Sequence, residues 1–420
     1  MKRKIFFLLG ILFFYLNLFS QVKTLEDSIT SLFVEQVSVY PQEKNYINTD
    51  RSNYVSGERI WFRVFLCDAI FNKQANASRY LYVELLNPLG VLEQKIKIKS
   101  DSLGLFYGHL DLEENQKEGD YTLCSYTEYM KNLGESYYCK KRVKVLNPSF
   151  EKIDLSLSFD LRSELDVTLS CTDKYSGVNV TVNEAFLKFS ENDTKQFRKH
   201  ESLEDVHCLL NAEKYSGKNA LLSFNVNGYS YSKYVNVPFQ KRNYDINFFP
   251  EGGHYLFEDS LRVGVKIVNA DGFGEAVKGV LKDENGSALM EFTTNKMGIG
   301  SFAFLFKRNE KYFVDIKNSK NEIQTKELIL NNKIGPCSLA THWINDSLCL
   351  SINKNIYSKL NTPLYLIIHS RGVPLYNKKI EDVEQNICFM NHELPLGVSH
   401  IILYTSDRVI LSERLIFNRH

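Results

Sequence analysis

Proline and tryptophan are scarce in this chain, with 9 and 2 residues in 420. Because proline is scarce and the apolar content of 44% is ordinary, we expect no long disordered linkers. An excess of one charge is also absent, because 51 basic residues stand against 50 acidic ones. A chain so close to neutral is a poor match for nucleic acid, so we expect no such partner.

Familiar catalytic motifs are missing as well: there is no GxSxG, no P-loop and no HExxH. His200, Glu201 and His207 come nearest to a metal-binding set. Even on one helix, the seven-residue separation of the two histidines would hold their rings about 10 Å apart, too far to share a metal. We therefore expect no enzyme activity, no metal site and no cofactor.

The first twenty residues differ in character from the rest. Lys2, Arg3 and Lys4 precede an apolar run over 5–16, and Ser20 offers a cleavage position, a layout typical of a secretory signal. The run is too short for a membrane span, and no cysteine follows it that could carry a lipid anchor. Removing residues 1–20 takes three of the 51 basic residues and none of the 50 acidic ones, which leaves a formal net charge of −2. We expect an exported protein whose mature chain has no transmembrane segment.

The stretch 45–66 holds the clearest strand pattern. Its second half alternates, and one set of side chains is apolar: Ile60, Phe62, Val64 and Leu66. The other set contains Arg59, Trp61, Arg63 and Phe65. A period of two indicates a strand with one face on a core and one face partly solvated.

One helix is predicted, over 23–34. Its apolar residues recur at helical spacing, and Thr24 is a good N-cap. These residues are Leu25, Ile29, Leu32 and Phe33. We expect this apolar stripe to dock on the first domain.

Strand patterns fill the remainder and predict an all-β fold. Residues 43–147 hold about seven strands, among them an alternating Lys/Ile edge strand over 95–99 and a segment at Tyr121 like the tyrosine corner of immunoglobulin-like sandwiches. Asn227 and Gly228 predict a type I′ hairpin. Taking Tyr121, Ala220, Tyr312 and His400 as markers of similar late strands gives intervals of 99, 92 and 88 residues.

Those intervals predict four tandem β-sandwiches with boundaries near Pro148, Lys241 and Asn332. The expected organisation is a signal peptide (1–20), a helix and linker (21–42) and sandwiches over 43–147, 148–241, 242–332 and 333–420.

The eight cysteines are even in number, but their spacing is irregular and no CxxC occurs. In an exported chain this permits disulfides without indicating a zinc or redox motif. Cys124 and Cys139, on what we interpret as consecutive strands, are the candidate cross-strand pair. The alternative, that the cysteines are buried free thiols, stays open.

Three segments resemble macroglobulin domains of the alpha-2-macroglobulin family, and most closely the macroglobulin-domain proteins of Bacteroidetes. The first is 43–66, the second is FFPEGGHYL over 248–256, and the third is 394–417. The matching positions of the first are Thr49, Asp50, Arg51, Tyr54, Gly57, Glu58, Trp61 and Phe62; the others carry Pro250, Gly252, Gly253, Gly397, Glu413 and Arg414. The resemblance implies immunoglobulin-like or fibronectin-like sandwiches in the periplasm or at the outer membrane.

The chain also departs from that family. Ser56 replaces the usual Pro before Gly57, and there is no GCGEQ thioester segment for covalent capture of a protease. Many of the larger relatives continue into a TonB-dependent receptor plug, which is not present after Phe417. The strand pattern that continues through Ile416 favours a finished product.

Several of these residues have simple structural roles in our interpretation. We expect Asp50 and Arg51 to form local hydrogen bonds, and Glu413 and Arg414 to form an ion pair on a solvated face. Residues 250–253 are expected to be an interdomain hinge or the start of the third sandwich, since paired glycines permit unusual backbone geometry. A set of three tyrosines either forms an aromatic binding surface or packs within strands: Tyr229, Tyr231 and Tyr234.

The function expected from these features is that of a non-catalytic, exported binding or scaffold protein of the cell envelope. By resemblance its partner is a TonB-dependent outer-membrane transporter, bound through sheet edges and interdomain loops. Two alternatives remain: an endopeptidase inhibitor without a thioester, and a glycan-binding or adhesin module that uses the tyrosines of the 227–228 hairpin.

Overall fold

The computed structural model describes residues 24–75, 77–161, 164–199, 205–239, 244–270, 272–318, 321, 323–330, 335–358, 362–381, 383 and 386–419. The predicted all-β class, with tandem sandwiches after a short N-terminal helix, is confirmed. His200 and Glu201, and the proposed signal peptide, lie outside the described residues.

Helix α2 spans Leu25–Val39 and begins at Thr24, whose side-chain oxygen accepts a hydrogen bond from the Asp27 backbone N–H at 3.2 Å. The predicted N-cap is therefore confirmed. Glu26 and Asp27 lie in the first turn, where carboxylates favour the positive end of the helix dipole. The helix continues five residues beyond the predicted end at Val34.

The first sandwich packs a three-stranded sheet, in the order β1-β3-β6, on a five-stranded one, in the order β2-β8-β7-β4-β5. Its core includes Ile60, Phe62 and Val64, the apolar set of the alternating strand, together with Tyr121. The strands are β1 (Glu43–Thr49), β2 (Asn53–Val55), β3 (Arg59–Asp68), β4 (Tyr80–Leu86), β5 (Leu92–Lys99), β6 (Phe106–Asp111), β7 (Gly119–Thr127) and β8 (Cys139–Leu146).

The second sandwich pairs the sheet β13-β14-β10-β9 with the sheet β12-β11-β15-β16 around its own apolar core. The four-residue helix α3 (Ala212–Tyr215) precedes β15. The strands are β9 (Ile153–Leu161), β10 (Leu165–Asp173), β11 (Val182–Ser190), β12 (Asp193–Gln196), β13 (Arg198–Lys199), β14 (Val206–Leu210), β15 (Asn219–Val226) and β16 (Tyr229–Asn236).

The third sandwich combines β17-β18-β21 with β20-β19-β22-β23, and a 3-10 turn, η4 (Glu251–Gly253), follows β17 directly. The strands are β17 (Asp245–Pro250), β18 (Ser260–Val268), β19 (Lys278–Asp283), β20 (Ala288–Thr293), β21 (Ile299–Leu305), β22 (Tyr312–Lys317) and β23 (Ile323–Leu328).

The fourth sandwich combines β24-β25-β28 with β27-β26-β29-β30. Its strands are β24 (Cys337–Ile344), β25 (Ser347–Lys354), β26 (Leu364–Ser370), β27 (Val373–Ile380), β28 (Ile387–Met390), β29 (Gly397–Thr405) and β30 (Ile410–Asn418).

The four sandwiches repeat one strand order although their residues do not repeat. The four sequence markers lie on β7, β15, β22 and β29. In its sheet, each of these strands lies between the strand that follows it in the sequence and an earlier strand. Tyr121 donates its hydroxyl hydrogen to the Lys117 carbonyl at 3.0 Å, which is the tyrosine-corner contact that the sequence indicated. A chain can keep this topology with unrelated residues because only the apolar period is required.

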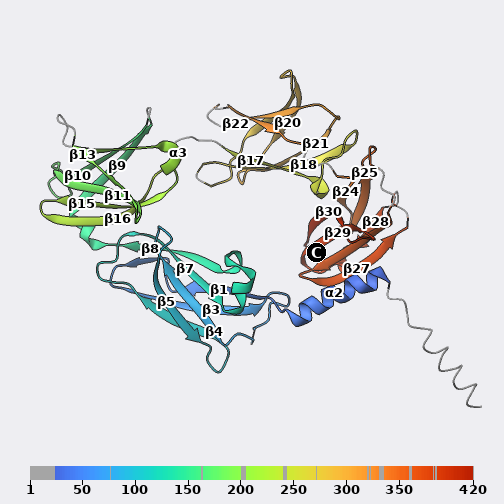
Figure 1. The fold of residues 1–420 in the computed structure, drawn as a ribbon, viewed down its shortest axis with the longest axis horizontal. Coiled ribbons are helices and arrows are strands. Elements are labelled where there is room, and N and C mark those ends of the chain that lie inside the picture. The colour runs from blue at the N-terminus through green and yellow to red at the C-terminus, as the bar shows by residue number, and fades with distance from the viewer. Residues whose placement is uncertain are drawn as a thin grey trace, which may run out of the picture.

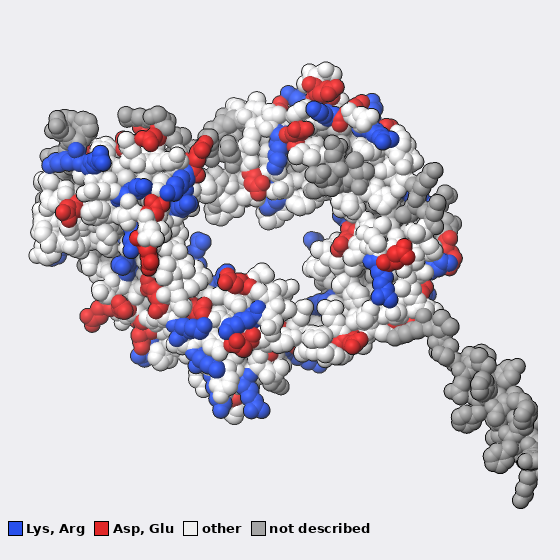
Figure 2. Space-filling model, viewed as in Figure 1, with Lys and Arg blue, Asp and Glu red and all other residues white. Residues whose placement is uncertain are grey.

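The sandwiches follow one another around a central opening (Figure 1). Helix α2 lies between the first and the fourth sandwich, so the array closes on itself at the N-terminal end of the described chain. Basic and acidic side chains are interspersed over the face in Figure 2, with no large field of one sign. We call this arrangement the ring.

Candidate binding surfaces at the domain junctions

The Asp50–Glu58 motif forms a compact hydrogen-bonded loop at the entry to β3. The Tyr54 hydroxyl donates to Asp50 Oδ1, Arg51 contacts Glu58 at 3.1 Å, and Glu58 Oε2 accepts from the Val55 N–H at 2.7 Å. Burial raises the pKa of Asp50, but hydrogen bonds from Tyr54 and Arg51 outweigh it, so that the pKa lies below its ordinary value. The pKa of Glu58 is also lowered, chiefly by the hydrogen bond from the Val55 N–H and next by the one from Arg51.

A glycine sets the turn of this loop. Gly57 adopts a φ of +82°, which only glycine adopts freely, and so allows the turn. The Trp61 carbonyl accepts from the Asp50 N–H at 3.1 Å, while its side chain lies on the solvated side of β3 and is 50% exposed.

The second and third family-like segments meet at the junction of the third and fourth sandwiches. Glu251 in η4 is 7% exposed, and its carboxylate contacts Arg414 of β30 at 3.0 Å and accepts from the Thr341 N–H at 3.2 Å. The Gly252 carbonyl accepts from the Ser412 hydroxyl at 2.7 Å. Residues 250–253 therefore do not start the third sandwich, because β17 (Asp245–Pro250) already opens it; they follow that strand and dock into the fourth sandwich.

Gly252 can enter this junction only because it lacks a side chain. Its φ is +76°, and a Cβ there would lie 2.3 Å from Ser338 Oγ and 2.7 Å from the Leu339 backbone nitrogen. Gly253 has a φ of +89° but open space around it. The first glycine is needed for close approach as well as for its backbone angle.

Glu413 and Arg414 do not pair with each other. Neighbours in a strand point to opposite faces, so Arg414 reaches Glu251 while Glu413 contacts His400 at 2.8 Å. The expected ion pair between them is wrong for this reason. Gly397, at the start of β29, has a φ of +95° and takes no part in the junction.

Helix α2 docks on the fourth sandwich, which corrects the expectation that it docks on the first. Leu25, Ile29 and Phe33 pack on the outer face of β26 and β29. The sheet side of this contact consists of Tyr365, Ile367, Ile402 and Tyr404. The Asn377 amide donates to the Glu26 carbonyl at 3.0 Å and to the Thr30 hydroxyl at 3.2 Å. Leu32, expected in the stripe, is 48% exposed.

A direct contact adds to this closure. Arg371, in the turn between β26 and β27, donates to the Ile70 carbonyl of the first sandwich at 2.7 Å. Phe33 also contacts His369, with ring centroids 5.0 Å apart. We call the contacts of α2 and Arg371 the clasp.

The sequence contains a signal for the clasp that alternation alone does not reveal. β26 and β29 contain consecutive apolar residues at 366–368 and 401–403, and both faces of these segments are buried. A strand with apolar residues on both faces needs cover on both sides. In the first sandwich β7 is also buried on both faces over 123–127, but there Met130 of the 3-10 turn η1 (Tyr129–Leu133) covers Cys124 and Tyr126.

The first and second sandwiches join through Glu118 and Lys233, whose side chains lie 2.7 Å apart and are largely buried. Tyr234 of β16 packs in the core of the first sandwich, with its ring 6.0 Å from that of Tyr121. A groove of about 490 Å³ lies beside this contact. Its polar lining includes Asn87, Asp120, Thr122, Lys140, Arg142, Asn219 and Asn236.

The three tyrosines proposed as a binding surface do not form one. Tyr229 is 70% exposed, but Tyr231 and Tyr234 are each 9% exposed. Tyr231 belongs to the second core and Tyr234 to the first. Asn227 and Gly228 have φ values of +51° and +80°, so the predicted I′ hairpin is confirmed and only its proposed ligand surface is wrong.

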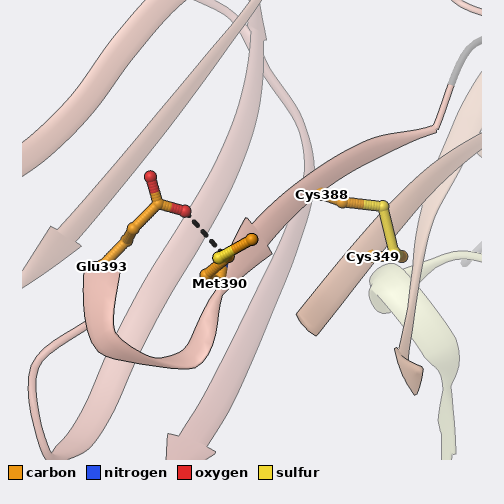
Figure 3. Close-up of a disulfide and its surroundings, with 4 residues drawn as sticks. All are labelled: Cys349, Cys388, Met390 and Glu393. Atoms are coloured by element: carbon orange, nitrogen blue, oxygen red, sulfur yellow. Dashed lines mark hydrogen bonds between the residues drawn. A yellow bond between two sulfur atoms is a disulfide. The ribbon is translucent and has the colours of Figure 1, made fainter. Parts of the chain in front are cut away.

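Cys124 and Cys139 are not bonded to each other. They lie on β7 and β8, but Cys139 is opposite Ser125 and Cys124 is opposite Lys140. A one-residue offset points the two side chains to opposite faces of the sheet, which excludes the bond. Instead Cys349 of β25 and Cys388 of β28 are directly opposite and form a disulfide, shown in Figure 3 with the nearby turn in which the Met390 N–H donates to Glu393.

Titratable groups do not assemble into a metal centre in the described part of the chain. His207, one of the three residues weighed above, lies with Nδ1 3.2 Å from Asp166 Oδ1 on the neighbouring strand. No helix among the described residues is both long and apolar enough to cross a membrane.

No protein-family model and no curated protein matches this chain. Solved structures are similar at low TM-score. Trypsin-activated alpha-2-macroglobulin from Escherichia coli has a TM-score of 0.31 and 12% identity, over 90% of this chain and 31% of that one. Salmonella alpha-2-macroglobulin reacted with methylamine has a TM-score of 0.31 and 12% identity, over 90% and 30%. The chain thus spans about a third of these macroglobulins.

The BSP domain of a biofilm-associated protein is also similar, with a TM-score of 0.26 and 9% identity, over 89% of this chain and 96% of that one. The described part of this chain is a tandem array of β-sandwiches. Bacterial alpha-2-macroglobulin and the biofilm-associated domain are similar to it in fold alone.

Proposed function

We propose that this protein is a non-catalytic binding or scaffold protein of the bacterial cell envelope, accessory to a TonB-dependent outer-membrane transporter. The observation that supports the proposal is the clasp, in which α2 and Arg371 connect the fourth sandwich to the first. Buried side chains at the junctions serve to hold the domains, as Glu251 and Lys233 do.

A closed array favours binding because its loops and sheet edges are already in place. Binding that has to order a flexible chain loses affinity, whereas a preformed surface avoids that loss. Sheet edges such as that of β5 can accept a strand from a partner, although its lysines discourage pairing with another copy. We expect the partner to contact more than one sandwich at once.

The test is a crosslinked pull-down of tagged residues 21–420 from the native envelope, with partners identified by mass spectrometry. We expect a TonB-dependent transporter to be enriched, and to be lost when Phe33→Ala opens the clasp. Leu32→Ala, on the exposed side of the same helix, is the matched control and should retain the partner.

Other outcomes would overturn the proposal. Enrichment of a protease, together with loss of protease activity at excess protein, would establish the inhibitor alternative. Equal enrichment by the wild type and by an unrelated tagged protein would remove the support for any envelope partner.

A further inference from the structure

The outer face of the sheet β1-β3-β6 carries an unusual set of exposed side chains. Four large aromatic residues are exposed there: Tyr46 (61%), Trp61 (50%), Phe65 (41%) and Tyr107 (61%). Among described residues, the corresponding sheets of the third and fourth sandwiches each expose one aromatic residue, Phe249 and Trp343, and that of the second exposes none. The set is thus a property of the first sandwich and not of the repeat.

The strand register brings these residues together. Tyr46 is opposite Phe65, Trp61 is opposite His109, and Arg63 is opposite Tyr107. Neighbouring strands are about 4.8 Å apart and alternate residues about 6.8 Å apart, so residues 59–65 of β3 and their neighbours cover about 20 Å by 10 Å. The ring centroids of Trp61 and His109 are 4.8 Å apart. We call this surface the aromatic face.

Positive charge is built into the same surface. The Arg59 guanidinium lies 5.2 Å from the Trp61 ring, and that of Arg63 lies 4.7 Å from the Phe65 ring. Arg59 is paired with Asp111 at 2.6 Å, whereas Arg63 forms no ion pair with any described residue. Stacking on an aromatic ring holds a guanidinium in place without using its N–H groups, which can then donate hydrogen bonds to a ligand.

We propose that the aromatic face binds an acidic polysaccharide. A pyranose ring presents a flat layer of C–H groups that packs on Trp61 or Tyr107, and its carboxylate accepts hydrogen bonds from Arg63. The face of a sheet offers side chains only, because the backbone N–H and C=O groups lie in the plane of the sheet and the side chains stand out from it. An extended acidic peptide gains most of its affinity from backbone pairing at an edge, so the flat face favours a sugar chain.

This inference is independent of the proposed transporter partner, because the pull-down depends on the clasp while the aromatic face lies on one sandwich. Affinity electrophoresis of residues 21–420 in gels that contain polygalacturonate tests it directly. We expect polygalacturonate to retard the wild type strongly, and added salt to weaken that retardation. Trp61→Ala and Arg63→Glu should each bind at least tenfold more weakly. Neutral dextran should not retard the protein.

Phe249→Ala is the matched control, because it removes an exposed aromatic residue from the corresponding sheet of the third sandwich. It should bind like the wild type. Tyr107→Ala is the second test variant, should Trp61→Ala fail to fold. The proposal is overturned if the wild type is not retarded, if Phe249→Ala loses binding equally, or if poly-glutamate retards the protein as well as polygalacturonate does.

Discussion

Glu251 of the third sandwich and Arg414 of the fourth form a 3.0 Å ion pair in which the carboxylate is almost fully buried. Removing one partner of such a pair leaves a charge without compensation. We predict that Glu251→Ala destabilises the protein by about 2–3 kcal/mol, at the lower end for buried pairs because Arg414 keeps some contact with water. Thermal unfolding measures this. Glu413→Ala, one residue away from Arg414 and half-exposed, should cost less than about 1 kcal/mol, and equal losses would contradict the assigned partners.

Gly252 and Gly253 allow backbone strain to be separated from close packing. Both have positive φ, so alanine at either position costs about 1–2 kcal/mol in backbone energy. Only at Gly252 does the added methyl meet the fourth sandwich, with a backbone nitrogen 2.7 Å away. We predict that Gly252→Ala is at least about 2 kcal/mol more destabilising than Gly253→Ala, by the cost of overpacking. Chemical denaturation of both variants checks this, and similar midpoints would refute it.

The clasp should control the dimensions of the protein. Phe33→Ala removes an aromatic side chain packed on the fourth sandwich and should cost about 1–3 kcal/mol of docking energy, since the site is only partly buried. We predict a larger radius of gyration in small-angle X-ray scattering for Phe33→Ala and for Ile29→Ala. Leu32→Ala should leave the scattering curve unchanged. An unchanged curve for all three would mean that α2 does not hold the ring closed.

The clasp should also weaken in mild acid. Burial, followed by the nearby His400, lowers the pKa of His369 below its ordinary value of 6.5, although Glu413 opposes this. His369 Nδ1 accepts from the Gly372 N–H at 3.2 Å, which requires the neutral ring, and Phe33 of α2 packs on that ring.

The direction in which pH changes the stability follows from the lowered pKa of His369. Because the folded form holds the proton less tightly, the stabilisation is fully present above pH 6.5 and is lost as the pH falls through the lowered pKa. We predict that unfolding stability drops between about pH 7 and pH 5. In His369→Gln the dependence on pH should be smaller over this range. If the stability of His369→Gln depends on pH as steeply as that of the wild type, another group is responsible for the dependence.

The disulfide should stabilise the fourth sandwich. Cys349 and Cys388 are 39 residues apart, and closing a loop of that length restricts the unfolded chain by about 3–4 kcal/mol. We predict a loss of about 2–4 kcal/mol for the Cys349→Ala/Cys388→Ala double variant, and for the wild type under a reductant. Cys124→Ala should lose as much stability on reduction as the wild type does, because Cys124 takes no part in the bond, and thiol labelling of the native protein should find Cys349 and Cys388 protected.

The local structure of this protein was predictable where residues close in sequence determine it. The period of two in β3 separates Ile60 and Phe62 from Trp61, and the positive φ at Asn227 and Gly228 follows from turn chemistry. The Lys and Ile alternation of β5 does lie at a sheet edge. Each of these depends only on residues close in sequence.

Contacts between distant segments were not predictable in the same way. The stripe of α2 shows that the helix docks, but not which of four similar sheets it covers, and Arg414 shows no partner until Glu251 is placed beside it. Cys124 and Cys139 failed as a pair because a one-residue shift in register reverses the side of the sheet. The exposed aromatic residues on β1 and β6 appear as one surface only after the register is known.

The position of the clasp also determines when the ring can form during synthesis. Chains emerge from the ribosome N-terminus first, and domains fold as they appear. Helix α2 is therefore made before any sandwich, while Ile402 and Tyr404, on which it docks, are made more than 360 residues later. Until the fourth sandwich is made, the apolar stripe of α2 lacks the sheet that covers it, so an interrupted chain exposes an apolar helix face that the finished chain buries.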